Sequence, residues 1–478
     1  MERDLLRRQL ADYAAKDRLP LHMPGHKRRL APAPGLPFAL DVTELPDTDD
    51  LHDAGGILAA AMNRTAALYG AARTWYLVNG STGGLLAAVR ALAPAGSAVI
   101  AARNCHKSVF HAIELGGLSV RWLLPPQAAS FGVWGSVPPQ SVAQALDACP
   151  QARCVILTSP TYEGAVSDIA AIAALCHRRG VPLLVDEAHG AHLGLPWAAG
   201  FPAGALQSGA DLVVQSAHKT LPSLTQTAWL HLGGPLAQRP GIADEIERQL
   251  DVFETSSPSY PLLVSLDGCT GLLRADGAAL FAGWKTRLDC FYAAAAQLKR
   301  LRVLGTGNQH PPEFFAFDRG KLLVSGRGTG FSGPALAAQL RGRFGIETEM
   351  ACGENLLAMT GPGDAEDALD RFAAALAALD AEAGSGTAPA PLPLPAPGET
   401  VCTIAAALAA PAADFAPAEV AGRVAAEYLW AYPPGVPLAA PGERLTPQLL
   451  ASLAALEQSG TRIHHSHAKN GCLRALLG

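Results

Sequence analysis

Four groups of polar residues in this chain each follow a short apolar run that has the composition of a buried strand. Lys219 comes after the run "DLVVQ", and Asp186 comes after the run "PLLV". Ligands of open α/β sheets bind beyond the carboxyl ends of the strands, so we expect these residues to meet at one edge of a sheet. The four groups occupy residues 80–83, 104–107, 186–189 and 216–219.

Lys219 stands in the stretch "QSAHKTLPSLTQTA", among small and hydroxylated residues where an amine gains little from water. Burial lowers the pKa of an ammonium group and frees its lone pair, which a lysine needs in order to form an imine with an aldehyde. Ser216 and His218 reach the same strand end. The pattern therefore predicts a nucleophilic amine at Lys219.

Asp186 ends an otherwise apolar run, and a carboxylate buried there requires a cation or a hydrogen-bond donor. His189 follows it three positions later, and His106 reaches the same predicted edge after "SAVIAAR". A helix cap or a structural ion pair is the alternative role for Asp186, and a structural role is the alternative for His106.

A turn made of Gly80, Ser81, Thr82 and Gly83 opens the helical stretch "GLLAAVRALA". Its backbone N–H groups, its hydroxyl groups and the positive end of the helix dipole suit a phosphate. An ordinary helix N-cap is the alternative.

One ligand accounts for all four groups, namely pyridoxal 5'-phosphate. Its phosphate would occupy the 80–83 turn, its aldehyde would join Lys219, and its ring nitrogen would face Asp186. A carboxylate there keeps the nitrogen protonated, so that the ring accepts the electrons left when a bond to the substrate Cα breaks. His106 could then lie on the face of the ring.

The elements that position these residues follow from hydrophobic patterning. Between about residues 55 and 235, apolar runs alternate with Ala- and Leu-rich helical stretches, which predicts an α/β fold with a mostly parallel, buried sheet. The strand candidates are "TWYLVN", "SAVIAA", "CVILTS", "PLLVDE", "DLVVQS" and "TAWLHL". After a helical stretch near 280–300, "KLLVS" and "ENLLAMT" predict a smaller α+β unit.

Changes in composition along the chain predict five segments. An N-terminal helix and an irregular arm would occupy 1–55, a cofactor-binding large domain 56–270, and a small α+β domain 271–385. A Pro-rich linker is expected at 386–400, and a C-terminal domain at 401–478.

The composition of the 478 residues indicates a globular enzyme, with 49% hydrophobic residues and a net charge of −5. The absence of Lys/Arg blocks argues against a nucleic-acid partner. Nine cysteines without a CxxC pair argue against a zinc site and against a dense disulfide framework. No secretion signal or membrane span is expected, which favours a cytoplasmic protein. The histidines of "TRIHHSHAKNG" are expected to form a surface tail and not a metal site.

At these residues the sequence resembles the fold-type-I pyridoxal-phosphate enzymes and, among them, the ornithine/lysine/arginine decarboxylases. The lysine signature of that family is matched at Ser216, His218, Lys219 and Gln226, whereas Pro222 departs from it. Further similar blocks follow in the family's order: "LHMPGHKRR", "DVTELPDTDDLH", "LYGAARTWYLVNGSTGG", "RNCHKS", "SPTYEGAVSDI", "DEAHGAH" and "AYPPGVPLAAPGE". The resemblance spans about residues 20 to 445 and implies the short form, without the N-terminal wing of longer members.

The resemblance implies an aspartate-aminotransferase-like large domain, a smaller α+β domain and a C-terminal domain. It implies that Lys219 holds the internal aldimine, that Asp186 pairs with the ring nitrogen and that His106 stacks on the ring. His189 would lie near the phenolic oxygen of the ring or the substrate imine. The phosphate contacts would come from Ser81, Thr82, Ser216 and His218.

The implied reaction is decarboxylation of arginine, lysine or ornithine to the corresponding amine and carbon dioxide, with a role in amino-acid metabolism and polyamine biosynthesis. Transamination, aldol cleavage and elimination remain alternatives, because the ring accepts electrons from whichever Cα bond the pocket holds perpendicular to it. A catalytically silent homologue is a third possibility. The family also implies a homodimer or higher homo-oligomer with a shared active site.

Several charged residues are candidates for contacts with the substrate. A basic side chain could be bound by one of the carboxylates Glu163, Glu347, Glu349, Glu354 or those of residues 47–50. An α-carboxylate clamp of the kind that transaminases use could come from Arg327, Arg341 or Arg343. The resemblance implies that His22, His26 and Lys27 of the arm complete the site of a partner subunit.

Overall fold

The structure is a computed structural model, and it describes residues 4–16, 23–24, 26–27, 35–384, 397–431, 435–458, 461–469 and 471–477. The chain forms two compact units, each built from two segments. The first unit combines residues 1–92 and 169–283, and the second combines residues 93–168 and 284–478. The predicted boundaries at 55, 270, 385 and 400 rest on composition alone and stay a prediction, and most of the predicted linker lies outside the described residues.

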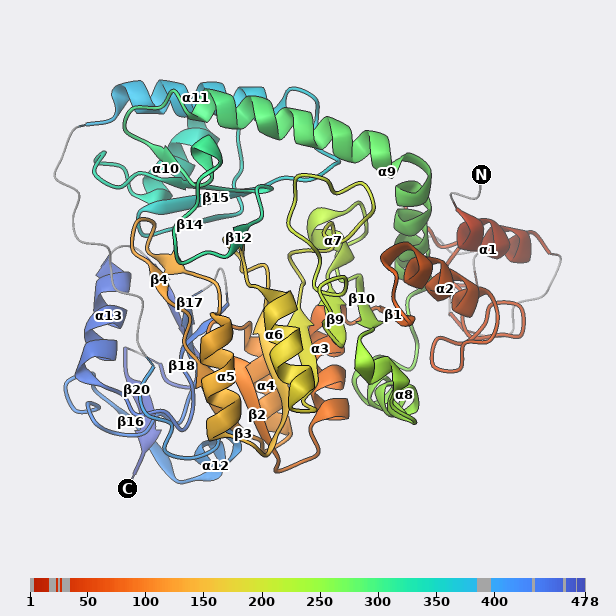
Figure 1. Cartoon of the computed structure of the whole chain (residues 1–478), viewed down its shortest axis with the longest axis horizontal. Helices are drawn as coiled ribbons and strands as arrows, with labels where there is room; N and C mark the ends of the chain where they lie inside the picture. Colours follow the sequence, from red (N-terminus) through yellow and green to blue (C-terminus); the bar gives the residue numbers. More distant parts are fainter. Residues whose placement is uncertain are drawn as a thin grey trace. The chain divides into compact units, whose positions relative to one another are not determined.

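The largest sheet has seven strands in the order β1-β10-β9-β8-β6-β2-β3 (Figure 1). The pairs β8–β9, β2–β6 and β2–β3 are parallel, whereas β10 is antiparallel to both β1 and β9. The predicted α/β class with a mostly parallel sheet is therefore confirmed, and each of the first six strand candidates forms a strand. The bounds are β1 (Arg73–Leu77), β2 (Ala98–Ala102), β3 (Ser119–Leu123), β6 (Ala152–Thr158), β8 (Leu183–Asp186), β9 (Leu212–Gln215) and β10 (Ala228–Leu232).

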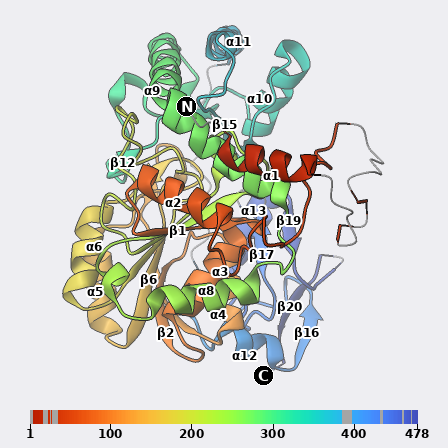
Figure 2. The same cartoon turned by 90° about the vertical axis from the view of Figure 1, so that its right-hand side faces the viewer.

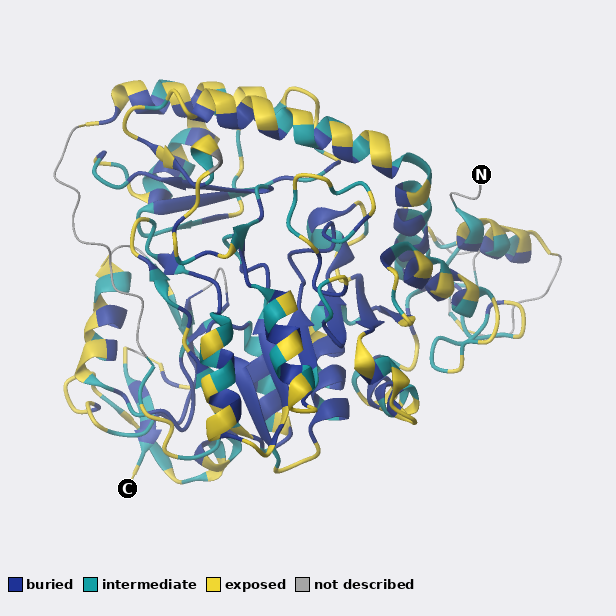
Figure 3. Ribbon diagram, in the orientation of Figure 1, coloured by how far each residue is buried: buried dark blue, intermediate teal, exposed yellow. Residues whose placement is uncertain are grey.

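In the first unit, strands β8, β9 and β10 are buried at every residue, as their Val- and Leu-rich sequences require (Figure 3). Helix α3 lies against β9 and β10 on one side and packs beside α8 on the other (Figure 2). The helices of this unit are α1 (Leu5–Ala15), α2 (Ile57–Tyr69), α3 (Gly80–Leu92), α6 (Ile169–Arg178), α7 (Ala217–Thr220), α8 (Ile242–Phe253) and the 3₁₀ turn η1 (Pro235–Gln238).

Helix α9 (Tyr260–Ala295) is 36 residues long and runs from the first unit into the second. The predicted helix near 280–300 is only its second half. The first half escaped prediction because its apolar residues surround the helix without a stripe, which is typical of a helix that is covered on several sides. None of the helices in the described ranges combines the length and the apolar character that crossing a membrane requires.

The second unit contains strands β2, β3 and β6 and a four-stranded antiparallel sheet in the order β11-β13-β15-β14. The predicted "KLLVS" and "ENLLAMT" strands are β13 and β15. The bounds of this sheet are β11 (Arg302–Val303), β13 (Lys321–Ser325), β14 (Met350–Cys352) and β15 (Asn355–Met359), and two short pairs join β4 (Gln127–Ala128) to β5 (Val133–Trp134) and β7 (Ala165–Val166) to β12 (Ala316–Phe317).

The C-terminal segment adds two small sheets, β16–β20 and β18-β17-β19, around a core of aliphatic side chains. Part of the predicted surface tail is instead strand β19, where His465 hydrogen-bonds to the buried Glu427 at 3.3 Å. The bounds are β16 (Ala412–Phe415), β17 (Leu429–Ala431), β18 (Pro437–Ala439), β19 (Ile463–His465) and β20 (Leu473–Leu476).

The helices of the second unit are α4 (Lys107–Leu115), α5 (Pro139–Ala148), α10 (Gly333–Gln339), α11 (Ala368–Glu382), α12 (Ile404–Ala409), α13 (Pro447–Gln458), the 3₁₀ turn η2 (Thr306–Asn308) and the π turn η3 (Leu340–Phe344). The segment "PALAAQLRGRF" belongs to α10 and to the π turn that continues it.

Candidate active site

Lys219 lies on the short helix α7, immediately after the carboxyl end of β9. Its Nζ is 3.0 Å from Nε2 of His189, which is 7% exposed. Lys219 itself is half-buried and so less enclosed than its small neighbours suggested. The geometry joins the predicted amine to the predicted histidine, two residues that lie 30 positions apart in the chain.

Asp186 is the last residue of β8, the parallel neighbour of β9, so that sheet pairing places it on the same edge as Lys219. Its carboxyl group is 2% exposed and accepts a hydrogen bond from the N–H of Ala188 at 3.1 Å. Burial raises the pKa of Asp186, and the charge of Lys219 and the bond from Ala188 oppose that rise. Asp186 is thus a buried acid within electrostatic reach of the amine, as the sequence predicts.

Glu187 is a buried acid whose part in the site the sequence analysis missed. Its carboxylate accepts hydrogen bonds from Nε2 of Gln215 at 2.7 Å and from the N–H of Ala205 at 2.8 Å. Burial raises the pKa of Glu187 to about 8. Oε1 of Gln215 in turn lies 3.1 Å from Nε2 of His231, and Nδ1 of His231 lies 2.8 Å from the Thr74 hydroxyl.

The orientation of the Gln215 amide sets the direction of this chain of hydrogen bonds. Because Gln215 donates from its nitrogen to Glu187, its oxygen must accept from His231, and the neutral imidazole then accepts at Nδ1 from Thr74. The burial of His231 lowers its pKa to about 3, which keeps the ring neutral. This fully buried relay of hydrogen bonds, from Thr74 through His231 and Gln215 to Glu187, therefore holds the backbone next to Asp186 in place.

The predicted phosphate turn forms the start of helix α3, and Gly80 has a left-handed φ of +71°. The first N–H groups of a helix have no acceptor within it and are available to an anion. The hydroxyl groups of Ser81 and Ser216 are 2.6 Å apart, so the turn adjoins the start of helix α7, which carries Lys219. Thr82 is exposed. The structure thus brings Gly80, Ser81, Thr82, Gly83 and Ser216 together.

Glu254 borders this turn and was also missed by the sequence analysis. Its Oε2 accepts hydrogen bonds from the N–H groups of Val78 at 3.1 Å and Asn79 at 3.0 Å, whereas its Oε1 is buried without a partner. Burial raises the pKa of Glu254 to about 7. No local pattern marks this residue, because the contact joins positions more than 170 residues apart.

His218 is half-buried, and its Nδ1 donates to the carbonyl group of Thr227 at 2.8 Å. Burial and the nearby charge of Lys219 lower the pKa of His218, against the effect of the bond to Thr227. With Nδ1 engaged, the neutral ring has an acceptor at Nε2. Its predicted contact with a phosphate stays a prediction.

His106 belongs to the second unit, where it caps helix α4. Its Nδ1 accepts a hydrogen bond from the N–H of Ser108 at 3.3 Å and lies 2.9 Å from the Ser108 hydroxyl. The structural role named as its alternative is therefore present. Its predicted stacking on a ring stays a prediction.

Comparison with known proteins identifies the family. The family model for the Orn/Lys/Arg decarboxylase major domain matches residues 6–283, and the model for the C-terminal domain of the same family matches residues 414–463. The chain belongs to the Orn/Lys/Arg decarboxylase family. The family predicted from the lysine signature is thereby confirmed.

Curated relatives of this decarboxylase-family chain match nearly its whole length. An uncharacterized protein of Bacillus subtilis, YaaO, is 33% identical over 480 residues, which covers 96% of this chain and 95% of that protein. The arginine decarboxylase of Halalkalibacterium halodurans is 30% identical over 461 residues, which covers 94% and 92% of the two chains.

Solved structures show the same fold. The lysine decarboxylase LdcF of Francisella novicida superposes with a TM-score of 0.83 at 18% identity, and the match covers 99% of this chain and 80% of that one. An alanine–glyoxylate aminotransferase of Nostoc has a TM-score of 0.54 at 16% identity over 69% of this chain and 88% of that one. The predicted aspartate-aminotransferase-like fold class is therefore confirmed.

Most of the charged residues that we considered for contacts with the substrate already have partners in the described part of the chain. Ion pairs join Arg341 to Glu347 at 2.9 Å and Arg327 to Glu354 at 3.6 Å, and Oε1 of Glu349 accepts from the Tyr162 hydroxyl at 2.6 Å. Three further candidates are paired as well: Arg343 with Glu382, Asp47 with Lys16, and Asp49 with the N–H groups of Gly55, Gly56 and Leu58.

Two further predicted residues lie in the N-terminal arm. His26 is 3.0 Å from Oδ2 of Asp41, and Lys27 has a left-handed φ of +54°. His22 lies outside the described residues. Their predicted role in the site of a partner subunit stays a prediction.

Proposed function

We propose that this chain is a pyridoxal-5'-phosphate-dependent decarboxylase of a basic amino acid. The observation that carries the proposal is the pairing of Lys219 with His189 at 3.0 Å, beside the buried Asp186 on the neighbouring parallel strand. A structural lysine has no need of a buried acid and a buried histidine on the same sheet edge. Membership of the Orn/Lys/Arg decarboxylase family supports the reaction class.

The residues of the first unit fit this cofactor. Lys219 would bind its aldehyde, and Asp186 would pair with its ring nitrogen. The donors at the start of α3, together with Ser81 and Ser216, would bind its phosphate. When bound, the cofactor supplies an electron sink for the bond that breaks at the substrate Cα.

The residues of this chain then perform the remaining tasks. His189, 3.0 Å from the lysine amine, is placed to take or return the proton of Nζ. Asp186 holds negative charge where the ring nitrogen requires it, and the relay from Thr74 through His231 and Gln215 to Glu187 keeps the neighbouring backbone in place. The amide donors of the α3 turn would hold the phosphate and so help to orient the cofactor.

We further propose arginine as the substrate, ahead of lysine and ornithine. Relatives named arginine decarboxylase match 91% to 94% of this chain at 29% to 30% identity. Relatives named lysine decarboxylase match only 50% to 56% of it, at 23% to 27% identity. A homodimer and a cytoplasmic location are part of the same proposal.

Absorbance spectroscopy tests the cofactor. Wild type incubated with pyridoxal 5'-phosphate is expected to show a visible band. Borohydride reduction should abolish this band and leave the cofactor covalently attached to the protein, and Lys219→Ala is expected to show neither the band nor the attachment. Lys299→Ala, which removes an exposed lysine, serves as the control and should behave as wild type. Absence of the band from wild type would overturn the cofactor assignment.

Carbon dioxide release from arginine, lysine and ornithine tests the reaction and the substrate. Release from arginine, with the matching amine as product, is the expected result. Formation of a keto acid in place of carbon dioxide would establish transamination and reject the proposed reaction. Faster release from lysine or ornithine would keep the reaction but reject arginine as the substrate.

A further inference from the structure

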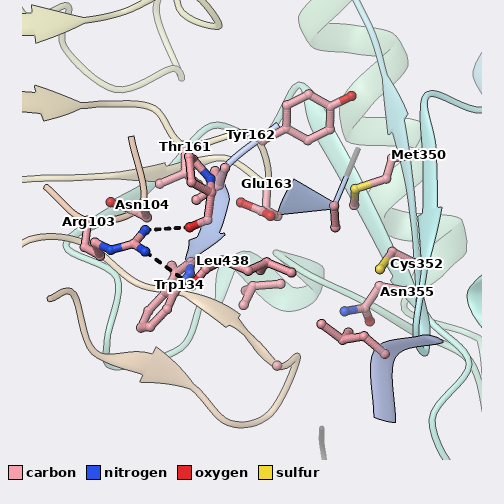
Figure 4. A pocket seen from close by; sticks show the side chains of 16 residues that line it. Arg103, Asn104, Trp134, Thr161, Tyr162, Glu163, Met350, Cys352, Asn355 and Leu438 are labelled. Carbon is pink, nitrogen blue, oxygen red and sulfur yellow. Dashed lines mark hydrogen bonds between the residues drawn. The ribbon is translucent and has the colours of Figure 1, made fainter. Parts of the chain in front are cut away.

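The second unit contains a cavity that the proposed reaction does not use. Its volume is about 160 Å³, and all 16 lining residues belong to this unit (Figure 4). An engineered cavity of roughly 150 Å³ accommodates benzene, so this one holds a molecule of about six heavy atoms.

Most of the wall of the cavity is apolar. Trp134 and Leu438 form one side, and the sulfur atoms of Met350 and Cys352 face the cavity from the other side (Figure 4). Such a wall suits a short aliphatic chain, because thioether and aromatic groups adapt to alkyl groups at little cost.

The one positive side chain in the lining, Arg103, already donates four hydrogen bonds. Its guanidinium group donates to both carboxylate oxygens of Glu443, at 3.0 and 2.9 Å, and to the carbonyl groups of Pro437 and Leu438 at 2.5 and 3.2 Å. Arg103 and Glu443 are 4% and 1% exposed. The positive charge of Arg103 is neutralised by Glu443, so this pair offers no net charge to a ligand.

Two amide oxygens among the lining residues are buried acceptors without donors. Asn355 is 9% exposed, and its nitrogen donates to the carbonyl group of Phe131 at 2.6 Å, while its side-chain oxygen is buried without a donor. The side-chain oxygen of Asn104, which is 7% exposed, is likewise buried without a donor. Buried acceptors without donors are costly, so both favour a ligand that brings N–H groups.

Glu163 supplies the negative charge. Its carboxyl group extends into the space bounded by Thr161, Leu438 and Trp134 (Figure 4). Burial raises the pKa of Glu163, and a hydrogen bond with the Thr161 side chain and the charge of Lys321 oppose that rise only in part. A cation that entered the cavity would stabilise this carboxylate.

We propose that this cavity binds a small aliphatic ammonium ion, with Glu163 as its counter-ion and the apolar wall around its alkyl chain. Aromatic faces at Trp134 and Tyr162 suit such a cation as well.

Calorimetric titration of the full chain with n-pentylamine tests the proposal. The protein carries Lys219→Ala and receives no cofactor, so that the amine has no aldehyde to react with. At about pH 8 the amine is charged. We expect it to bind at least about tenfold more tightly than 1-pentanol, which has the same number of heavy atoms and no charge. Equal affinity for the two probes would overturn the proposal.

Variants locate the site. In the same background, Glu163→Gln is expected to weaken pentylamine binding by about tenfold or more, whereas Glu354→Gln, a half-buried acid outside the cavity lining, should leave it within about twofold. Unchanged binding in Glu163→Gln would overturn the proposal.

A second variant keeps the test decisive if Glu163→Gln does not fold. Cys352→Leu adds bulk to the cavity wall and retains Glu163, so it should also lose the amine. Retained affinity in this variant would place the amine elsewhere and reject the cavity. Because the titrated protein lacks Lys219, these results are independent of carbon dioxide release by wild type, and either claim can fail alone.

Discussion

Glu254 places a titratable charge beside the turn at which we propose that the cofactor phosphate binds. Its carboxyl group accepts hydrogen bonds from the N–H groups of Val78 and Asn79, which lie directly before that turn. Burial raises the pKa of Glu254 to about 7. Below that pH the group is mostly neutral and tolerates an anion. Above it, the carboxylate repels one.

We therefore predict that the affinity for pyridoxal 5'-phosphate falls by about tenfold more in wild type than in Glu254→Gln when the pH is raised from about 6 to 8. Glutamine can accept both backbone bonds with its oxygen and does not ionise. Fluorescence titration of each protein with the cofactor gives the two affinities. Parallel pH profiles would show that Glu254 does not act on the phosphate.

His231 gives the stability of the protein a pH dependence of known sign. Its folded-state pKa of about 3 lies below the value of about 6.5 in an unfolded chain, so the unfolded state binds the extra proton. The contribution of the neutral His231 ring to the free energy of unfolding is therefore complete above pH 6.5, and it is lost as the pH falls toward 3.

We predict that the unfolding free energy of wild type, compared with that of His231→Gln, falls by about 1.4 kcal/mol for each pH unit between roughly 6 and 4. Urea unfolding at several pH values measures this slope. His310→Gln, at an exposed position, is the control and should keep the wild-type slope. A wild-type slope in His231→Gln would contradict the assignment of a neutral buried ring.

At the scale of elements, the junction of β1 and α3 depends on close packing at glycine. A Cβ atom on Gly83 would lie 2.7 Å from Oε1 of Glu254 and 3.1 Å from Cβ of Asn79. Both distances are too short for an unstrained side chain at position 83. The start of the helix can therefore approach Glu254 and Asn79 this closely only because glycine has no side chain. The sequence shows a glycine-rich turn, but this reason for Gly83 lies in the contact with Glu254.

We predict that Gly83→Ala lowers the unfolding free energy by about 1–3 kcal/mol through overpacking and weakens cofactor binding by displacing the turn. Urea unfolding and cofactor titration measure the two effects. Gly363→Ala is the matched control, because a Cβ there would meet nothing within 4 Å, and it should change stability by no more than about 0.5 kcal/mol. Similar behaviour of both variants would reject the packing argument.

At the scale of the molecule, the second unit is built from chain segments far apart in sequence. Arg103, just after β2, pairs with Glu443 of the C-terminal segment, and the two residues are 340 positions apart. The guanidinium group also stacks over the rings of Phe110 and Trp122, at 5.1 and 5.5 Å. Loss of either charge leaves the other buried without a partner, which is far more costly than loss of an exposed pair.

We predict that Glu443→Leu lowers the unfolding free energy by about 3–5 kcal/mol, and that Arg103→Met added to it restores part of the loss. Arg444→Met is the neighbouring control, because it removes only exposed contacts, the pair with Glu399 and the hydrogen bond to the Gly422 carbonyl group, and should cost about 1 kcal/mol or less. Denaturant unfolding measures all of these variants. A small effect of Glu443→Leu would mean that water reaches the Arg103 charge.

The sequence by itself determined the α/β class, the family, and the set of Lys219, Asp186 and the 80–83 turn. Each of these follows from local pattern, because a polar residue directly after an apolar strand has a fixed place at the edge of the sheet. The match of the lysine signature then selected the family.

Only the tertiary structure decided the rest. Glu254 reaches the turn from more than 170 residues away, and the contacts of His231 with Thr74 and Gln215 depend on the antiparallel pairing of β10 with β1 and β9. The cavity at Glu163 forms where loops, a small sheet and the C-terminal segment meet. Such contacts depend on strand register and on long-range packing, and neither leaves a mark in the residues immediately around the ones it brings together.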